Sequence, residues 1–191
     1  MLAWDYWHNK ELFKQEDSRY RKPPLLLEHI QDRDLWKFKL ANTREIQANL
    51  FSYDYDFELW DKLMHADQVE LLKMTVAGAA IERKHHKDIA ELVKVTKYYR
   101  SIGPYVVPVA SLPYVFSSDA GSLMAKEYES GRYFAACYWD TPDGRTFSLR
   151  STEHGLDVSL IAAHYSGGGH KNAAGFSVPR NHPLANREEA K

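Results

Sequence analysis

The sequence lacks three features that define large classes of protein. Its single cysteine, Cys137, excludes an internal disulfide and a zinc site built from several thiolates. No run approaches the ~18 to 20 consecutive apolar residues that a membrane-spanning helix needs. The first residues lack a basic region followed by a long apolar run, which excludes a signal peptide at this position. These absences predict a cytoplasmic protein with no membrane partner.

The chain also has little excess charge. Twenty-five Lys and Arg residues stand against 26 Asp and Glu among the 191 residues, a net charge of -1. This balance argues against coating nucleic acid by bulk charge, although it permits a local basic pocket. The sequence contains no Walker loop, dinucleotide fingerprint or Ser-His-Asp nucleophile motif. A hydrophobic fraction of 44% with 13% aromatics is typical of a folded chain.

Residues 1–100 have helical patterning. Trp4 and Trp7 share a face of a helix expected within residues 1–13, and Asn42 or Thr43 is a candidate cap for a helix over residues 45–50. Residues 67–100 contain no proline and one glycine. Their apolar residues follow the helical period and predict a helix of ~50 Å. The apolar positions used are Leu72, Val76, Ala79, Ile89, Leu92 and Val93. Because its middle is polar nearly all round, this helix is expected to join two packed bodies.

Residues 101–180 have mixed patterning. Short aromatic and β-branched runs predict strands over residues 105–110 and 132–139, with a helix over residues 118–126 between them. A Pro-Asp-Gly turn predicts a hairpin between residues 132–139 and 145–150. Asp157 is expected to cap a further helix, and residues 175–178 to form a last strand before a frayed polar tail.

The run Ser166-Gly-Gly-Gly-His-Lys-Asn-Ala-Ala-Gly175 is the most informative segment. Three consecutive glycines are unfavourable for stability, but they permit unusual φ angles and close approach of another group to bare N–H groups. Such backbone binds phosphates, and His170 and Lys171 add donors. A flexible glycine turn is the alternative.

Arg150 is a second candidate. Strand alternation places Phe147 and Leu149 in the core and Ser148 and Arg150 on the opposite face, where a bidentate grip on phosphate is available. A solvated arginine with a salt-bridge partner is the alternative. His85 and His86, which diverge on a helix, are interpreted as solvated, and Cys137 as a buried inert thiol.

The pair Asp32 and Asp34 is a third candidate, because two carboxylates two residues apart can contribute to a divalent-ion site. A hydrolytic metal needs three or more protein ligands, so a surface cluster of ion pairs around Arg33 competes with this interpretation.

These motifs resemble a known family. Residues 167–170 followed by Asn172-Ala-Ala-Gly175 look like the signature of the DHHA1 domain, the substrate-binding domain of DHH phosphoesterases, and residues 147–151 resemble its other phosphate-contacting strand. The family includes manganese-dependent nanoRNases, RecJ-type exonucleases and cyclic-dinucleotide phosphodiesterases. The resemblance implies a phosphate site on this chain. Its residues are Arg150, Ser151, Gly167, Gly168, Gly169, His170, Ala173 and Gly175.

The resemblance also implies a division of the chain. Residues 26–38 look like the end of a DHH domain, whose fourth motif supplies one aspartate, Asp32 or alternatively Asp34, to a Mn²⁺ pair. The expected fold is α/β (α+β): a helical DHH remnant at 1–66, a connecting helix at 67–100, a mixed DHHA1 domain at 101–180 and a flexible tail at 181–191. The first three metal motifs are missing, so the expectation is a truncated chain that is inactive alone.

Three functions follow from this interpretation. The first is hydrolysis of short oligonucleotides or cyclic dinucleotides, which in the family requires Mn²⁺ bound at a site with all its ligands. The second is a module that binds nucleotide phosphates without turnover. The third is an interaction protein that self-associates, as a homodimer for example, through apolar surface around Trp4, Trp7 and residues 25–27.

Overall fold

The computed structural model describes residues 23–186. The chain divides into one compact unit that ends at Lys84 and another that begins at His85. This boundary falls inside helix α6 (Gln68–Thr96), so residues of that helix belong to both units. The helix expected within residues 1–13, with Trp4 and Trp7, lies outside the described residues.

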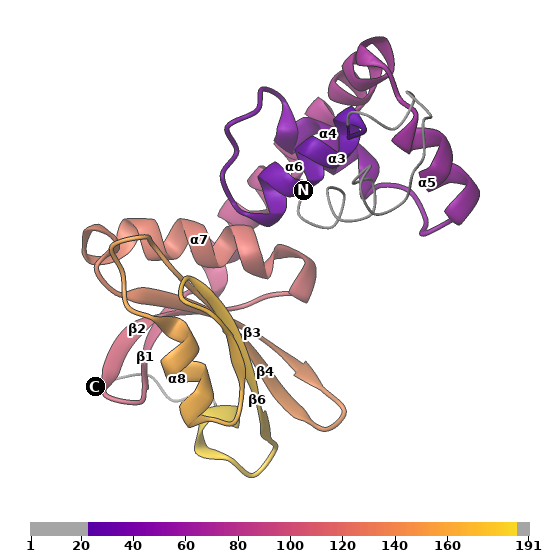
Figure 1. Ribbon diagram of the computed structural model, residues 1–191. Coiled ribbons are helices and arrows are strands. Elements are labelled where there is room, and N and C mark those ends of the chain that lie inside the picture. Colours follow the sequence, from indigo (N-terminus) through magenta and orange to yellow (C-terminus); the bar gives the residue numbers. More distant parts are fainter. Residues whose placement is uncertain (1–22, 187–191) are drawn as a thin grey trace, which may run out of the picture. The chain divides into compact units, whose positions relative to one another are not determined.

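The first unit is helical where it is described. It contains α3 (Leu25–Asp34), α4 (Thr43–Leu50), α5 (Phe57–Met64) and the first part of α6 (Figure 1). Its buried apolar residues are Leu26, Ile46, Leu50, Leu71 and Met74. A Cβ atom on Gly78 would lie 1.8 Å from the carbonyl oxygen of Glu45. The glycine therefore permits the close crossing of α4 and α6.

The helix expected over residues 45–50 is confirmed with Asn42 at its N-cap position, but the expected side-chain capping bond is not formed. Asn42 has a left-handed backbone with φ 65° and makes no side-chain capping bond. The Thr43 hydroxyl donates instead to the carboxylate of Asp32, 2.8 Å away. A tertiary partner has taken the group that a local cap would have used.

Helix α6 corrects two expectations. Leu72 and Val76 were assigned to its packed face but are 60% and 71% exposed, whereas Leu71 and Met74 are buried. The helix face with Leu72 and Val76 and the face with Leu71 and Met74 are both apolar. The close crossing at Gly78 determines that the face with Leu71 and Met74 is buried. The helix also ends at Thr96 rather than at Arg100, because residues from Tyr98 onward pair in a sheet. Within residues 23–186, no helix combines the length and apolar character that crossing a bilayer requires.

The second unit is built on one mixed sheet. Its described strands are β1 (Tyr98–Ile102), β2 (Tyr105–Ser111), β3 (Phe134–Thr141), β4 (Gly144–Ser151), β5 (Gly168–His170) and β6 (Ala173–Pro179). They lie in the order β1-β2-β3-β4-β6-β5. Strands β2 and β3 are parallel, and the other neighbours are antiparallel. The predicted hairpin is confirmed, because β3 and β4 pair up to Thr141 opposite Gly144.

Helices cover both faces of this sheet. Helix α7 (Ser117–Glu127) connects β2 to β3 between the short helices η2 (Tyr114–Phe116) and η3 (Tyr128–Gly131), and α8 (Val158–His164) precedes β5. One core contains Phe147 and Leu149 packed with Val158 of α8. The other contains Cys137 with Met124 of α7 and Ile89 of α6. The predicted α7 and α8 are therefore confirmed, and the unit has the expected mixed α/β architecture (Figure 1).

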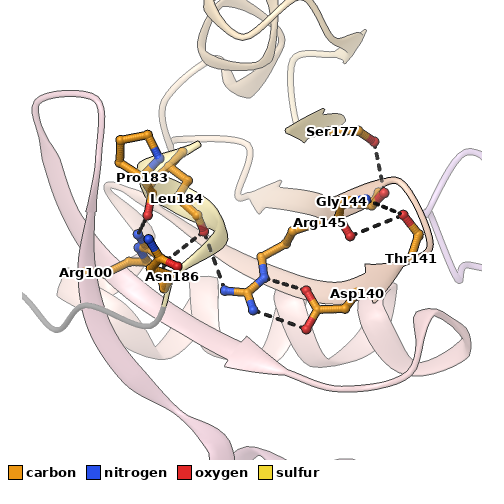
Figure 2. Close-up of polar contacts among 10 residues, drawn as sticks. Arg100, Asp140, Thr141, Gly144, Arg145, Ser177, Pro183, Leu184 and Asn186 are labelled. Carbon is orange, nitrogen blue, oxygen red and sulfur yellow. Dashed lines mark hydrogen bonds and ion pairs between the residues drawn. The ribbon is translucent and has the colours of Figure 1, made fainter. Parts of the chain in front are cut away.

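Two buried arginines hold the turn after β6. Arg100 donates to the carbonyl oxygens of Leu184 and Asn186 at 3.1 and 2.9 Å. Arg145 donates to the Leu184 oxygen and forms a two-bond ion pair with Asp140 (Figure 2). The short helix η4 (Pro183–Ala185) forms where a frayed tail was expected. Main-chain acceptors leave no sequence signature, so this anchoring could not be predicted.

Candidate phosphate-binding site

Arg150 projects from the face of β4 that carries α7. Its guanidinium donates to the Ser118 hydroxyl at 2.7 Å, the Ser148 hydroxyl at 3.0 Å and the Leu149 carbonyl oxygen at 2.8 Å. A Cβ atom on Gly121 would lie 2.9 Å from Cγ of Arg150, so the arginine stem runs close beneath the helix. The prediction that Arg150 lies on the face opposite Phe147 and Leu149 is confirmed. That face is not open at Arg150, because the first turn of α7 covers it.

The positive charge of Arg150 is not neutralised by a direct ion pair. Within residues 23–186, no carboxylate lies within salt-bridge distance of its guanidinium, which overturns the alternative of a solvated arginine with such a partner. Burial lowers the pKa of Arg150 from its ordinary value, while Cys137 and Asp119 oppose that shift. A guanidinium stays charged at neutral pH, so this site holds a partly desolvated cation that favours an anion.

The glycine run is an edge strand rather than a loop. Gly168, Gly169 and His170 form β5 and pair with residues 173–175 of β6. The preceding Gly167 donates its N–H to the Ala162 carbonyl oxygen at 2.9 Å. The expectation of a phosphate loop is therefore corrected, because the run forms a strand that pairs with the small residues that follow it. The outer edge of β5 remains the border of the sheet.

Two of the three glycines are required by close packing. A Cβ atom on Gly167 would lie 2.2 Å from the Gly175 carbonyl oxygen, and one on Gly169 would lie 2.5 Å from that of Ala173. Gly169 also has φ 144°, a backbone that favours glycine. At Gly168, by contrast, a Cβ would meet nothing within 4 Å. Packing among residues 23–186 therefore does not explain why Gly168 lacks a side chain.

Strand register brings five of the predicted residues onto one face, namely Arg150, Gly168, His170, Ala173 and Gly175, whereas Gly169 pairs with Ala174 in the row of the opposite face. Arg150 is opposite Ala173, which is opposite His170 on the next strand. Ser148, Gly175 and Gly168 form the adjacent row. Directly paired residues share a face, and neighbouring strands lie ~4.8 Å apart. Arg150 and His170 are therefore about 10 Å apart along the sheet, and the small residues between them form a low floor.

Ser151 does not join this face. Its N–H and hydroxyl donate to the carbonyl oxygens of Asn172 and Lys171, while the Asn172 amide donates to the hydroxyl at 3.0 Å. The Lys171 ammonium donates to the Glu153 carbonyl oxygen at 3.0 Å. These bonds tie the end of β4 to the turn between β5 and β6. Ser151 and Asn172 therefore fix the register that aligns Arg150 with His170.

Sequence reasoning missed Ser118. This residue lies in the first turn of α7, 32 positions before Arg150, and its hydroxyl accepts a hydrogen bond from the guanidinium. A serine at a helix start has the ordinary signature of a capping residue. No sequence signal was available, because the contact depends on how α7 lies over the sheet.

The two adjacent histidines of α6 differ in environment. His86 is exposed, as interpreted, whereas His85 is half-buried with Nε2 3.1 Å from Oδ2 of Asp119. The His85 ring also lies 5.4 Å from the ring of Phe116. The interpretation of a solvated pair is therefore wrong for His85. Cys137 is buried as expected, and desolvation raises the pKa of its thiol to about 12.

Asp32 is buried rather than part of a surface cluster of ion pairs. Its carboxylate accepts from the N–H groups of Lys39 and Leu40 and from the hydroxyl of Thr43. Burial raises the pKa of Asp32, but these bonds outweigh it and hold the pKa below its ordinary value. Arg33 instead lies over the ring of Phe51, and Asp34 is exposed.

Asp32 was predicted to be a ligand of a Mn²⁺ pair, and its hydrogen bonds bear on that role. Both carboxylate oxygens of Asp32 are already bonded to the protein. Over residues 23–186, no cluster of three or more His, Cys, Asp or Glu side chains is placed to hold an ion. The described residues therefore do not by themselves fit a manganese pair.

Comparisons with known proteins give a sequence relative and structural neighbours of low sequence identity. No family model matches the chain. An uncharacterized protein of Acanthamoeba polyphaga mimivirus is 31% identical over 160 residues, which cover 81% of this chain and 37% of that protein. An exopolyphosphatase-related protein from Bacteroides fragilis matches with a TM-score of only 0.42, at 16% identity over 83% of this chain and 52% of its own.

The pGpG-specific phosphodiesterase PggH from Vibrio cholerae has a TM-score of 0.50. It is 14% identical, and the match covers 93% of this chain and 66% of that one. The chain thus spans about a third of the viral relative and two thirds of the bacterial enzyme. A similarity at this level of sequence identity shows a shared fold and no shared function. The chain has an α/β fold shared with the pGpG-specific phosphodiesterase.

Proposed function

We propose that this chain is a DHH/DHHA1-type phosphoesterase chain whose second unit binds a phosphate of a short oligonucleotide or a cyclic dinucleotide. The observation that carries the proposal is the alignment of Arg150 and His170 across a floor of small residues. The guanidinium would hold the phosphate, and His170 would donate to it from the sheet edge. Gly168, with open space where a side chain would stand, would let the ligand approach the backbone.

The proposal draws on three independent features. The glycine-histidine run resembles the DHHA1 signature, and its Gly168 and His170 share a face of the sheet with Arg150. The half-buried Arg150 has no carboxylate bound to it within the described part of the chain. A neighbour with the same fold is a pGpG-specific phosphodiesterase, which supports a small phosphodiester ligand rather than a long duplex. The near-neutral net charge agrees with a pocket that takes a few nucleotides.

Binding of a fluorescein-labelled dinucleotide, followed by anisotropy, tests this site. Arg150→Ala and His170→Ala are each expected to weaken binding by at least about 1 kcal/mol, roughly fivefold, because each removes a charge-assisted or donor contact. Arg132→Ala and His154→Ala are matched controls, since both residues are exposed in the same unit. Unchanged affinity in both site variants, with folding intact, would remove the assignment.

Turnover separates hydrolysis from binding alone. Release of mononucleotide from a labelled dinucleotide would be measured with and without added Mn²⁺, using His170→Ala and Arg150→Ala in parallel. Mn²⁺-dependent release lost in both variants would support hydrolysis by this chain. Binding without release would support the second function, a phosphate-binding module. The activity of the longer relatives is in either case a separate question, because the chain spans only part of each.

A further inference from the structure

A second candidate ligand surface lies in the first unit, on the loop of residues 35–42 between α3 and α4. Trp36, Phe38 and Asn42 have φ angles of 54°, 48° and 65°. The left-handed region is strained for bulky aromatic residues. The buried apolar cluster of this unit contains neither aromatic ring. At Trp36 the end of α3 accounts for this backbone, because the Trp36 N–H donates to the Arg33 carbonyl oxygen at 2.7 Å and the Lys37 N–H to that of Asp32 at 2.9 Å. Core packing within the described residues does not explain the same backbone at Phe38.

Asp32 holds this loop in place. Its carboxylate accepts from the N–H groups of Lys39 at 2.9 Å and Leu40 at 3.0 Å, and its carbonyl oxygen accepts from Lys37 N–H at 2.9 Å. The Asp32 side chain is only 6% exposed. Strained conformations persist where surrounding bonds over-determine them, and such places concentrate at ligand sites. The loop is a built feature with a fixed shape.

The loop presents aromatic and cationic groups in alternation. The rings of Trp36 and Phe38 meet edge to face at 5.1 Å, and the guanidinium carbon of Arg44 lies 3.8 Å from the centre of the Phe38 ring. Lys37 and Lys39 are exposed. Both lysines line a hollow of about 280 Å³ together with Glu28, Gln31, Asp32 and Leu40. The acids of the hollow are Glu28 and the buried Asp32, whose carboxylate accepts bonds from the loop, and the exposed Lys37 and Lys39 are its cations.

We propose that this loop is a second contact site for a single-stranded oligonucleotide, an inference that rests on the proposed function. Lys37 and Lys39 contact backbone phosphates, and the half-buried Trp36 ring packs against a base. Proteins that bind single strands combine cations that follow the backbone with aromatic rings that accept bases. The site adds a nucleotide contact within the first unit, independent of the Arg150 face.

The test measures binding of 5′-fluorescein-labelled penta-adenylate to the full chain over a range of salt concentrations. Each lost phosphate contact reduces the slope of log K against log salt by ~0.7 for single strands. The variant Lys37→Ala with Lys39→Ala is therefore expected to have a slope shallower by about 1.4 and an affinity about fivefold weaker. Lys62→Ala with Lys97→Ala removes the same charge from exposed positions and should leave the slope unchanged.

A second variant tests the aromatic contact. Trp36→Ala is expected to weaken binding about threefold or more with an unchanged salt slope, while Trp36→Phe retains most of the affinity. The charge-neutral pair Lys37→Gln with Lys39→Gln replaces the alanine variant if that one fails to fold, as judged by circular dichroism.

The outcomes separate this inference from the proposed function. Binding that Arg150→Ala weakens but the lysine and Trp36 variants leave unchanged would overturn the loop site and leave the function standing. Absence of binding by the unmodified chain would reject both. A shallower slope in the lysine variant together with weaker binding by Trp36→Ala would establish the loop as a nucleotide contact.

Discussion

The two units support their candidate ligand surfaces in different ways. In the second unit, Arg150 and His170 are aligned by the register of three regular strands, and within β4, β5 and β6 only Gly169 has a positive φ. In the first unit, Trp36 and Phe38 stand on irregular backbone that one buried carboxylate holds. Regular pairing places side chains through periodicity, whereas an irregular loop depends on specific tertiary bonds. The two surfaces should therefore respond differently to mutation and to pH.

The largest expected effect is in the sheet. Phe147 is fully buried, and its ring stacks on that of Phe176 with centroids 4.9 Å apart. Phe147→Ala is expected to destabilise the second unit by about 3 to 5 kcal/mol, the cost of removing a buried aromatic ring and leaving a cavity. Hydrogen exchange should report a loss of amide protection in residues 98–179 and little change in residues 25–64. Equal loss in both units would mean that they unfold as one body.

A smaller effect is expected from pH in the first unit. Thr43 has one hydroxyl hydrogen and gives it to Asp32, so Nδ1 of His29, 2.8 Å from the Thr43 oxygen, carries a proton and donates. Desolvation lowers the pKa of His29 below 6.5, although the nearby acids oppose this. Below pH 6.5 the unfolded chain therefore binds more protons at this site than the folded chain, and folding stability falls.

Chemical denaturation between pH 5 and pH 7.5 measures this linkage. The contribution of His29 is fully present above pH 6.5 and is lost as pH falls through the lowered pKa, with a slope below about 1.4 kcal/mol per pH unit for one proton. His29→Gln is expected to flatten the profile in this window. His154→Gln, at an exposed position of the second unit, is the matched control. A steeper fall after removal of His29 would contradict the assignment.

The same contrast explains what the sequence could predict. The hairpin of β3 and β4, helices α7 and α8 and the face of Arg150 followed from alternation, a Pro-Asp-Gly turn and helix periods, all of which are local signals. The β5 strand was missed because glycines carry no strand propensity, and it forms only because residues 173–175 are small enough for close pairing. Ser118 was missed because its role depends on how a helix lies over a sheet.

Asp32 illustrates the limit most clearly. The family resemblance drew attention to its carboxylate as a ligand, and the surface alternative treated it as a solvated charge. Its hydrogen-bond partners are two main-chain amides and the hydroxyl of Thr43, none of which a pattern of side-chain types can reveal. The prediction of which face of α6 is buried was wrong for a related reason. Leu71 and Leu72 are adjacent and of the same residue type, and only the crossing at Gly78 decides which of them is buried.

The smallest expected effect tests how much strain the loop of residues 35–42 stores without a ligand. Asn42 has φ 65° and no capping bond, so Asn42→Gly keeps every described contact and relieves the left-handed backbone. It should stabilise the first unit by about 0.5 kcal/mol, whereas Asn42→Ala should destabilise it by about 1 kcal/mol. Thermal unfolding of the pair measures the difference. A stabilising alanine would mean that the strain resides in Trp36 and Phe38 alone, which would concentrate it at the residues proposed to meet a base.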